Sequence, residues 1–188
     1  MVTKNVEKVI RYYLLFLPPR DVKSILDIGG GMTTPYKGVL RNRCWRYANI
    51  DKREGRNVDY VSDIVSGTPF KDEEWEWGWC VETVEHITKN KQNKFVKEVL
   101  RICRNVVFTF LTPEHPSFNK DPEHKKVVVG FKKLKKTHQV TDKSTKTGRR
   151  IFIVTKDKVE VKPHGVFYVD KKTEKPIDRW LVEKRNQM

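Results

Sequence analysis

The stretch Ile25-Leu26-Asp27-Ile28-Gly29-Gly30-Gly31-Met32 decides the fold, because an apolar run ends there in three consecutive glycines. The apolar run predicts a buried strand, and the glycines behind it predict a tight turn. Without Cβ atoms, the turn lets the backbone approach a ligand closely and present its N–H groups to it. A simple strand-to-helix connection would use the same glycines, so the turn alone does not identify a site.

Strand-like and helix-like segments alternate on both sides of this turn. An amphipathic helix is expected over residues 2–17, and Thr34-Pro35 is typical of an N-cap followed by proline at the first position of a helix. The remaining pattern predicts strands over 24–28, 45–50, 58–61, 77–81 and 106–111 and helices over 34–42 and 90–103. Such alternation predicts βαβ units and a mostly parallel sheet with helices on both faces.

The C-terminal part of the chain has weaker patterns and more charge. A helix is expected over 127–136 and short strands over 150–155, 158–162 and 165–169, which together favour an antiparallel C-terminal hairpin. The whole chain carries 39 Lys and Arg against 24 Asp and Glu, a net charge of +15. Residues 121–188 hold 19 of the basic and 9 of the acidic groups, and so contribute +10. This excess indicates a polyanionic partner, nucleic acid first, unless it reflects a lysine-rich composition.

Composition also excludes several classes of protein. No apolar run approaches the length of a membrane span, and the three cysteines form no CxxC pair, which favours reduced thiols in a cytoplasmic protein. The 188 residues suit one domain with a core of its own, and no internal repeat or linker divides them.

Three acids follow three of the predicted strands. Asp27 lies beside the glycine turn, Asp51 ends the second strand, and Asp63 follows the third. Because open α/β sheets bind ligands outside the carboxyl ends of their strands, these acids are expected to line one crevice. Three unrelated solvated acids are the alternative.

Five ordered motifs together resemble those of class I S-adenosylmethionine-dependent methyltransferases. They are Leu26-Asp27-Ile28-Gly29-Gly30-Gly31, Asn49-Ile50-Asp51, Ser62-Asp63-Ile64, Thr68-Pro69-Phe70 and Val81-Glu82-Thr83-Val84-Glu85-His86-Ile87. The resemblance implies a Rossmann-like class I methyltransferase fold, with S-adenosyl-L-methionine as cofactor. Its layout would be a single domain over 1–188, with an N-terminal helix in 1–20, a cofactor-binding core over 22–113, and basic acceptor-side and C-terminal strands over 114–188. The glycines lack the GxGxxG spacing of dinucleotide dehydrogenases.

The resemblance also assigns cofactor-binding residues. Gly29, Gly30 and Gly31 would lie against the methionine part, and Asp27 would face its amino group through backbone or water. The other implied residues are Asp51 for the ribose, Asp63 and Ile64 for the adenine, and Val81 and Glu82 beside the turn. One departure is Gly78, where relatives carry Asp after an aromatic residue such as Trp77.

The E-x-x-E-H stretch supplies candidates for proton transfer or metal binding. Glu82, Glu85 and His86 are spaced to share one helical face, and His115 and His124 follow the last parallel strand. We expect catalytic roles for Glu85, His86 and His115. Oxygen and imidazole ligands suit Mg²⁺, Mn²⁺ or Zn²⁺.

The same stretch resembles that of two groups of O-methyltransferases. In enzymes that methylate the 2′-hydroxyl at the 3′ end of small RNAs, the matching residues hold a divalent metal, here Glu82, Glu85, His86 and His124. Ubiquinone-pathway O-methyltransferases share the stretch, and the aromatic segment of the RNA enzymes is replaced here by Lys126-Val127-Val128. A hydrogen-bonding cluster without metal is the alternative.

Two basic clusters favour nucleic acid as the acceptor. One surrounds the second strand and contains Arg41, Arg43, Arg46, Lys52, Arg53 and Arg56, and the other contains Lys132, Lys133, Lys135 and Lys136. Some of Trp75, Trp77 and Trp79 are expected to pack in the core or to cover the cofactor, and stacking on bases is the alternative. The sequence therefore predicts a methyltransferase acting on RNA or DNA. The alternatives are a small-molecule O-methyltransferase and an inactive binding protein with the same fold, for which Gly78 is the support.

Overall fold

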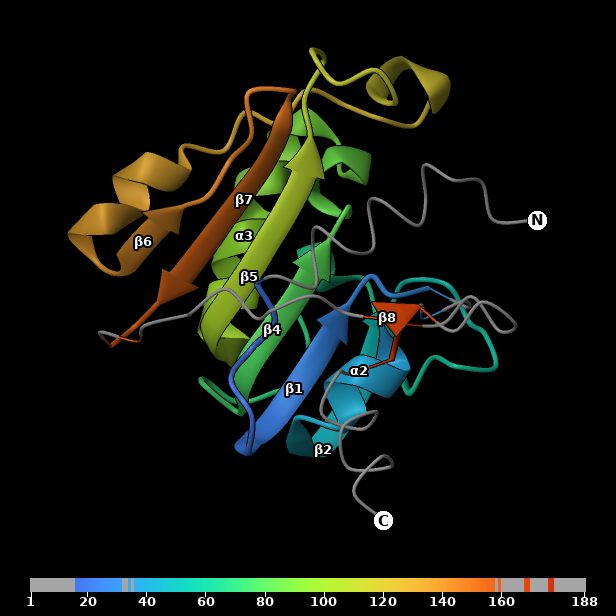
Figure 1. Cartoon of the computed structure of the whole chain (residues 1–188), viewed down its shortest axis with the longest axis vertical. Coiled ribbons are helices and arrows are strands. Elements are labelled where there is room, and N and C mark those ends of the chain that lie inside the picture. The colour runs from blue at the N-terminus through green and yellow to red at the C-terminus, as the bar shows by residue number, and fades with distance from the viewer. Residues whose placement is uncertain are drawn as a thin grey trace.

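A computed structural model describes residues 16–31, 34, 36–157, 159, 168–169 and 176–177. Seven strands form one sheet in the order β3-β2-β1-β4-β5-β7-β6 (Figure 1). Their bounds are β1 Val22–Ile28, β2 Cys44–Asp51, β3 Tyr60–Val61, β4 Trp75–Val81, β5 Cys103–Leu111, β6 Gln139–Asp142 and β7 Arg149–Thr155. A separate two-stranded ladder pairs β8 Tyr168–Val169 with β9 Pro176–Ile177.

The direction of the strands confirms the predicted mostly parallel sheet. β1 pairs in parallel with β2 and β4, and β4 pairs in parallel with β5. β7 then runs antiparallel to both β5 and β6, as the opposed arrows in Figure 1 show. The C-terminal antiparallel hairpin is therefore present, but it joins β6 to β7 rather than residues 150–155 to 158–162. Of the strands expected over 158–162 and 165–169, only residues 159, 168 and 169 are described.

Helices cover both faces of the sheet, as the alternating pattern predicts. α3 (Lys89–Ile102) buries Gln92, Phe95, Val96, Val99 and Ile102 at helical spacing against one face, where they pack among Leu26 and Ile28 of β1. α2 (Lys37–Arg41) packs on the other face with Ile25 (Figure 1). Because both faces are covered, β1 is buried at every position except Lys23.

Two local predictions are wrong. α2 begins at Lys37 with Tyr36 at the N-cap position, and Thr34 has a φ of +34° and accepts the Lys37 N–H through its carbonyl instead of capping with its side chain. The helix expected over 127–136 is a short 3₁₀ helix, η4, over Phe131–Lys136. Phe131 anchors η4 because its ring is buried and stacks on Phe152 of β7.

The N-terminal helix expected over 2–17 lies almost wholly outside the described residues. Phe16 and Leu17, at its predicted end, are buried in the cluster on the α2 face. Three further 3₁₀ helices, η1 Ile64–Ser66, η2 Val84–His86 and η3 Phe118–Lys120, follow strands β3, β4 and β5. Among the helices that the structure describes, none combines the length and apolar character needed to cross a membrane.

Buried aromatic and sulfur side chains complete the core. Trp75, Trp77 and Trp79 of β4 are each at most 1% exposed, so the prediction that they pack in the core is confirmed. Cys80 and Cys103 are buried free thiols. With five parallel strands, the carboxyl ends of β1 to β5 meet at one edge of the sheet, where the predicted site residues gather.

Candidate active site

A cavity of about 360 Å³ lies at the carboxyl ends of β1, β2 and β4. Its lining includes five of the residues predicted to bind a cofactor, Gly29, Asp51, Asp63, Ile64 and Glu82, together with the predicted catalytic residue His86. These side chains come from segments up to 57 residues apart in the chain (residues 29 and 86). Of the three acids expected to line one crevice, Asp51 and Asp63 therefore do so, whereas Asp27 is not among its lining residues.

The glycine turn is closely packed on one side and open on the other. Gly29 has a φ of +71°, and a Cβ there would come within 2.5 Å of Cγ2 of Thr83. A Cβ on Gly30 would meet Cγ of Asp27 at 2.8 Å. Gly31 has a φ of +59°, but its nearest neighbours would be Arg53 at 3.6 Å and Asp51 at 3.8 Å. The turn thus needs glycine for its shape, and Gly31 faces the space beside Asp51.

Asp51 and Asp27 have different surroundings. Oδ1 of Asp51 accepts the Arg53 N–H at 2.9 Å, and the Arg53 side chain lies 3.4 Å from the same oxygen. Asp27 is buried beneath Gly30, and the Tyr47 hydroxyl donates to its Oδ2 at 2.8 Å. Burial raises the pKa of Asp27 to about 7, although the Tyr47 hydrogen bond opposes the rise. Asp27 therefore supports the turn from below, whereas Asp51 borders the cavity.

Asp63 and Ile64 border the cavity from the end of β3. The Asp63 carboxylate is the N-cap of η1, accepting from the Val65 N–H at 3.1 Å and from the Ser66 hydroxyl at 3.3 Å. Ile64 is a buried apolar neighbour of this cap. An acid and an aliphatic side chain next to each other suit a flat heterocycle with an amino group.

No protein-family model matches the sequence, and no curated protein sequence matches it either. Solved structures do. A SAM-dependent methyltransferase from Archaeoglobus fulgidus superposes with a TM-score of 0.61 at 14% identity, over 80% of this chain and 93% of that one. A SAM-dependent methyltransferase from Aquifex aeolicus superposes with a TM-score of 0.57 at 14% identity, over 84% of this chain and 100% of that one. The small RNA methyltransferase HEN1 gives 0.60 at 14% identity, over 88% of this chain but 27% of that one.

The chain has the class I methyltransferase fold. Because the identities are low, the likeness is one of fold, and the strand order 3-2-1-4-5-7-6 with an antiparallel β7 agrees with it. The residues at the strand ends fit the cofactor that the sequence motifs imply. A nucleoside with a charged tail requires three features that are present here. They are a glycine turn whose space a Cβ would fill, a carboxylate at the end of β2, and an apolar neighbour at the end of β3.

Gly78 has a structural explanation in this methyltransferase fold. It lies in the middle of β4, where a Cβ would meet Sγ of Cys103 at 3.0 Å and side-chain carbons of Ile28 and Val106 at 3.2 Å. An aspartate there would place a carboxylate inside the core. Gly78 is not among the residues that line the cavity. Val81, also predicted to bind the cofactor, packs instead against the core cluster on the α2 face.

The E-x-x-E-H residues do not share one helical face, so that prediction is wrong. Glu82 precedes η2 and has a φ of +49°, which turns the chain before the 3₁₀ helix starts. Glu85 is fully buried, and its Oε1 accepts the Leu111 N–H at 2.9 Å. Burial raises the pKa of Glu85 to about 8. Glu82 instead places Oε1 3.7 Å from Nη1 of Arg149.

A different group of possible metal ligands forms around His86. Ligand atoms of His86, Asp121 and His124 lie within 4.8 Å of one another. Nδ1 of His124 lies 2.8 Å from the carbonyl oxygen of Phe118. Because a carbonyl oxygen can only accept, Nδ1 carries the proton. Nε2 then keeps its lone pair, and it lies 3.7 Å from Oδ2 of Asp121. A backbone carbonyl behind a histidine is the usual orientation of a metal ligand. The structure therefore groups two predicted ligands, His86 and His124, with Asp121 rather than with Glu82 and Glu85.

His115, predicted to be catalytic, lies apart from this group. Its Nδ1 accepts the Ser117 N–H at 3.1 Å, and its Nε2 lies 3.2 Å from Nη2 of Arg149. Burial and the Arg149 charge lower the pKa of His115. Both ring nitrogens already face N–H donors, which is unfavourable for a general base.

Four residues of the site were missed as cofactor, catalytic or metal residues. Thr83 packs on Gly29 and donates to the carbonyls of Ile28 and Val81, and Arg53 pairs with Asp51. Asp121 belongs to the Asp-Pro-Glu-His-Lys stretch, so its proximity to His124 was visible in the sequence. Arg149 gave no sequence signal that separated it from the adjacent Arg150.

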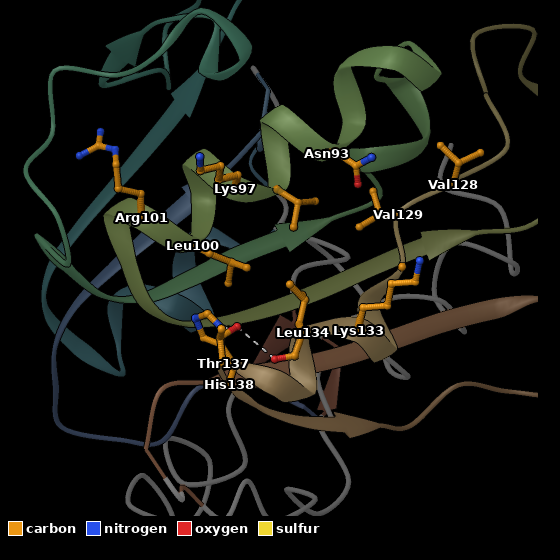
Figure 2. A pocket seen from close by; sticks show the side chains of 12 residues that line it. Asn93, Lys97, Leu100, Arg101, Val128, Val129, Lys133, Leu134, Thr137 and His138 are labelled. Carbon is orange, nitrogen blue, oxygen red and sulfur yellow. Dashed lines mark hydrogen bonds between the residues drawn. The ribbon is translucent and has the colours of Figure 1, made fainter.

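A second cavity, of about 650 Å³, lies between α3 and η4 (Figure 2). Leu100 and Leu134 lie between the two helices, and Lys97 and Lys133 extend from opposite sides (Figure 2). This cavity is on the face of the sheet that α3 covers. It shares no lining residue with the cleft at the strand ends, so it is separate from the cofactor cleft.

Proposed function

We propose that the protein transfers a methyl group from S-adenosylmethionine to a nucleic acid. The observation that supports the transfer best is the cleft at the carboxyl ends of β1, β2 and β4, where the glycine turn and Asp51 face each other. Asp51 would accept from the ribose hydroxyls, and the backbone of the glycine turn would lie against the charged end of the cofactor. The bound cofactor supplies an electrophilic sulfonium methyl.

The residues of this chain align the acceptor and manage its proton. An in-line displacement gains most of its rate from holding the two reacting atoms in position. An acceptor hydroxyl must also lose its proton, and His86 lines the cleft where it can take it. Alternatively, His86, Asp121 and His124 would together hold a divalent ion such as Mn²⁺ or Mg²⁺, which would lower the pKa of a bound hydroxyl, and His86 would then be a ligand rather than the base.

The nucleic-acid acceptor is supported by charge. Four exposed lysines crowd η4, at Lys132, Lys133, Lys135 and Lys136. The predicted cluster around β2 is weaker support, because Arg43 is buried with Nη1 donating to the Pro18 carbonyl, and Arg46 stacks over Trp75 and pairs with Glu74. The phosphate-binding surface that we propose is therefore η4 and the loops beside it.

Similar solved structures carry both kinds of acceptor in their names. HEN1 is a small RNA methyltransferase, while a phosphoethanolamine N-methyltransferase from Haemonchus contortus superposes with a TM-score of 0.56 at 12% identity, over 79% of this chain and 42% of that one. A small-molecule acceptor is thus the second candidate. The hypothesis of an inactive binding protein with the same fold loses its support, because core packing explains Gly78.

Transfer of a tritiated methyl group to total RNA, to DNA and to a small-molecule extract tests the proposal. We expect label in a nucleic-acid fraction. Label only in the small-molecule fraction would favour the second candidate, and label in none of the three would contradict methyl transfer.

The acceptor surface is tested by the salt dependence of nucleic-acid binding. Each phosphate neutralised releases counterions, so log affinity should fall with log salt with a slope of several units. Reversal of the four η4 lysines should flatten the slope by about three to four units. The control reverses four exposed lysines elsewhere, Lys23, Lys71, Lys89 and Lys91. Equal flattening in both variants would show that net charge, rather than η4, is responsible.

A further inference from the structure

The cavity between α3 and η4, called here the α3–η4 groove, has an aliphatic floor (Figure 2). On α3 its lining residues follow the spacing of one helical face and are Asn93, Val96, Lys97, Leu100 and Arg101. Val129 and Leu134 lie opposite, and both pack against the same core cluster as Leu100. Val128, 49% exposed, extends the aliphatic surface beside Asn93 (Figure 2). Aliphatic surface of this kind, bordered by polar residues, is typical of an interaction site.

The two helices that form the walls of the groove are rich in lysine. α3 carries the exposed Lys89, Lys91, Lys94 and Lys97, and η4 carries the four exposed lysines named above. Lys97 and Lys133 line the groove itself, from opposite walls (Figure 2). Arg101 also lines it, but Glu98 and Asp72 each accept from its guanidinium at 2.7 Å. Within the described part of the chain, no Asp or Glu lines the groove, so its charge is positive.

Both walls are fixed to the core before any ligand binds. Gln92 of α3 is fully buried, and its Oε1 accepts the Val128 N–H at 2.8 Å. Its Nε2 donates to the carbonyls of Ile87 at 3.1 Å and Lys126 at 3.4 Å. Phe131 anchors η4, as described above. The groove is therefore preorganised, which lowers the entropic cost of binding.

The dimensions of the groove match a short helix. From Asn93 to Arg101, α3 rises about 12 Å, eight residues at about 1.5 Å each, which is slightly more than two turns. An amphipathic helix that lies in an apolar groove uses anchors at positions i, i+3 or i+4, and i+7, which also span about two turns. Bases of a nucleic acid instead stack on aromatic rings, and none of the described lining residues is Phe, Tyr or Trp.

Charge separates a foreign partner from this chain itself. A second copy carries a net charge of +15 and would be repelled by the lysine-rich walls. Residues 1–15 hold three basic groups against one acidic, and residues 158–188 hold eight against five, so these segments are also basic. An occupant that complements both the aliphatic floor and the lysines must combine aliphatic with acidic side chains.

We propose that the α3–η4 groove docks an acidic amphipathic helix of another protein. The aliphatic side chains of that helix pack against Leu100 and Leu134, and its carboxylates pair with Lys97 and Lys133. The proposal goes beyond methyl transfer, because the groove and the cofactor cleft share no lining residue. Of the four η4 lysines that we propose for phosphate binding, only Lys133 lines the groove.

Fluorescence anisotropy with a synthetic peptide tests the groove without any methyl transfer. The labelled peptide carries leucine on one helical face and glutamate on the other. One control peptide has the same composition in scrambled order, and a second contains glutamate alone. We expect micromolar binding of the amphipathic peptide and at least about tenfold weaker binding of both controls. Equal affinity for the all-glutamate peptide would show that charge alone is responsible and would overturn the proposal.

Two matched double variants locate the binding. Lys97→Glu with Lys133→Glu should weaken binding of the amphipathic peptide at least about fivefold, because two attractions become repulsions. The control, Lys91→Glu with Lys135→Glu, reverses the same charges on the same two helices at exposed positions outside the groove. All four side chains are exposed, so both variants should fold, which thermal denaturation checks. Equal weakening in the two variants would overturn the proposal.

A labelled oligouridine tests nucleic acid as the alternative occupant. We expect oligouridine to lose affinity equally in the two double variants, because each reverses one lysine of α3 and one of η4. A loss of oligouridine affinity that is confined to the Lys97→Glu and Lys133→Glu variant and exceeds the loss for the peptide would assign the groove to nucleic acid and overturn the proposal.

Discussion

Replacing Gly29 by alanine should destabilise the protein far more than the same change at Gly31. Both residues have positive φ, +71° and +59°, which costs an alanine about 1–2 kcal/mol. At Gly29 the new Cβ would also come within 2.5 and 2.6 Å of Cγ2 and Oγ1 of Thr83, and such overpacking costs about 1–3 kcal/mol more. At Gly31 the nearest atom is 3.6 Å away. The expected loss in free energy of unfolding is therefore about 2–5 kcal/mol for Gly29→Ala and about 1–2 kcal/mol for Gly31→Ala.

Urea denaturation of both variants measures this difference, and a double-mutant cycle identifies its cause. Thr83→Ala removes both overlapping atoms but also the hydroxyl proton shared between the carbonyls of Ile28 and Val81, at a cost of about 1 kcal/mol. In the Gly29→Ala background, the same change should cost at least about 1 kcal/mol less than it does in the native protein. Equal stability of the two glycine variants, or no coupling between Gly29 and Thr83, would refute this packing of the turn.

Three further predictions concern Asp51, Glu85 and the group of possible metal ligands. Asp51→Ala should weaken S-adenosylhomocysteine binding at least about tenfold in calorimetry, because a hydrogen bond to a charged group contributes roughly 1.5–3 kcal/mol, whereas the control Glu54→Ala should not. Burial raises the folded-state pKa of Glu85 from 4.5 to about 8, so the free energy of unfolding should fall as the pH rises between these values. Glu85→Gln should flatten that fall. If urea denaturation shows the same pH dependence of stability in both proteins, this prediction is wrong. If a metal is used, a chelator should abolish methyl transfer, Mn²⁺ should restore it, and His124→Ala should be unresponsive to Mn²⁺; chelator-resistant activity would exclude the metal.

The sheet could be predicted because its strands and α3 carry strong local patterns. Four of the seven residues of β1 and six of the nine of β5 are apolar, and α3 repeats its buried residues at helical spacing. β6 was missed because its four residues are mostly exposed, and pairing with β7 rather than apolar side chains holds it in the sheet. The helix expected over 127–136 had only a weak pattern behind it, and only Phe131 among its residues is buried deeply enough to anchor a helix there.

The cleft at the strand ends was predictable because the residues that line it follow different strands of the sheet. Gly29 and Asp51 reach the cleft whenever parallel strands end at one edge. The acceptor side depends on loops whose paths the sequence does not reveal. Glu82 has a positive φ and lies outside the 3₁₀ helix that holds Glu85 and His86, and Asp121 reaches His86 across 35 residues of chain (121 against 86). Arg149 could not be distinguished from Arg150 until the register of β7 placed one inside and the other outside.

Calorimetric titration of the native protein with S-adenosylhomocysteine tests the central claim most directly. The account predicts one site per chain with micromolar affinity, in the cleft where Gly31 faces Asp51. A folded protein that gives no binding at millimolar concentrations of S-adenosylhomocysteine would contradict the assignment of this cleft to the cofactor.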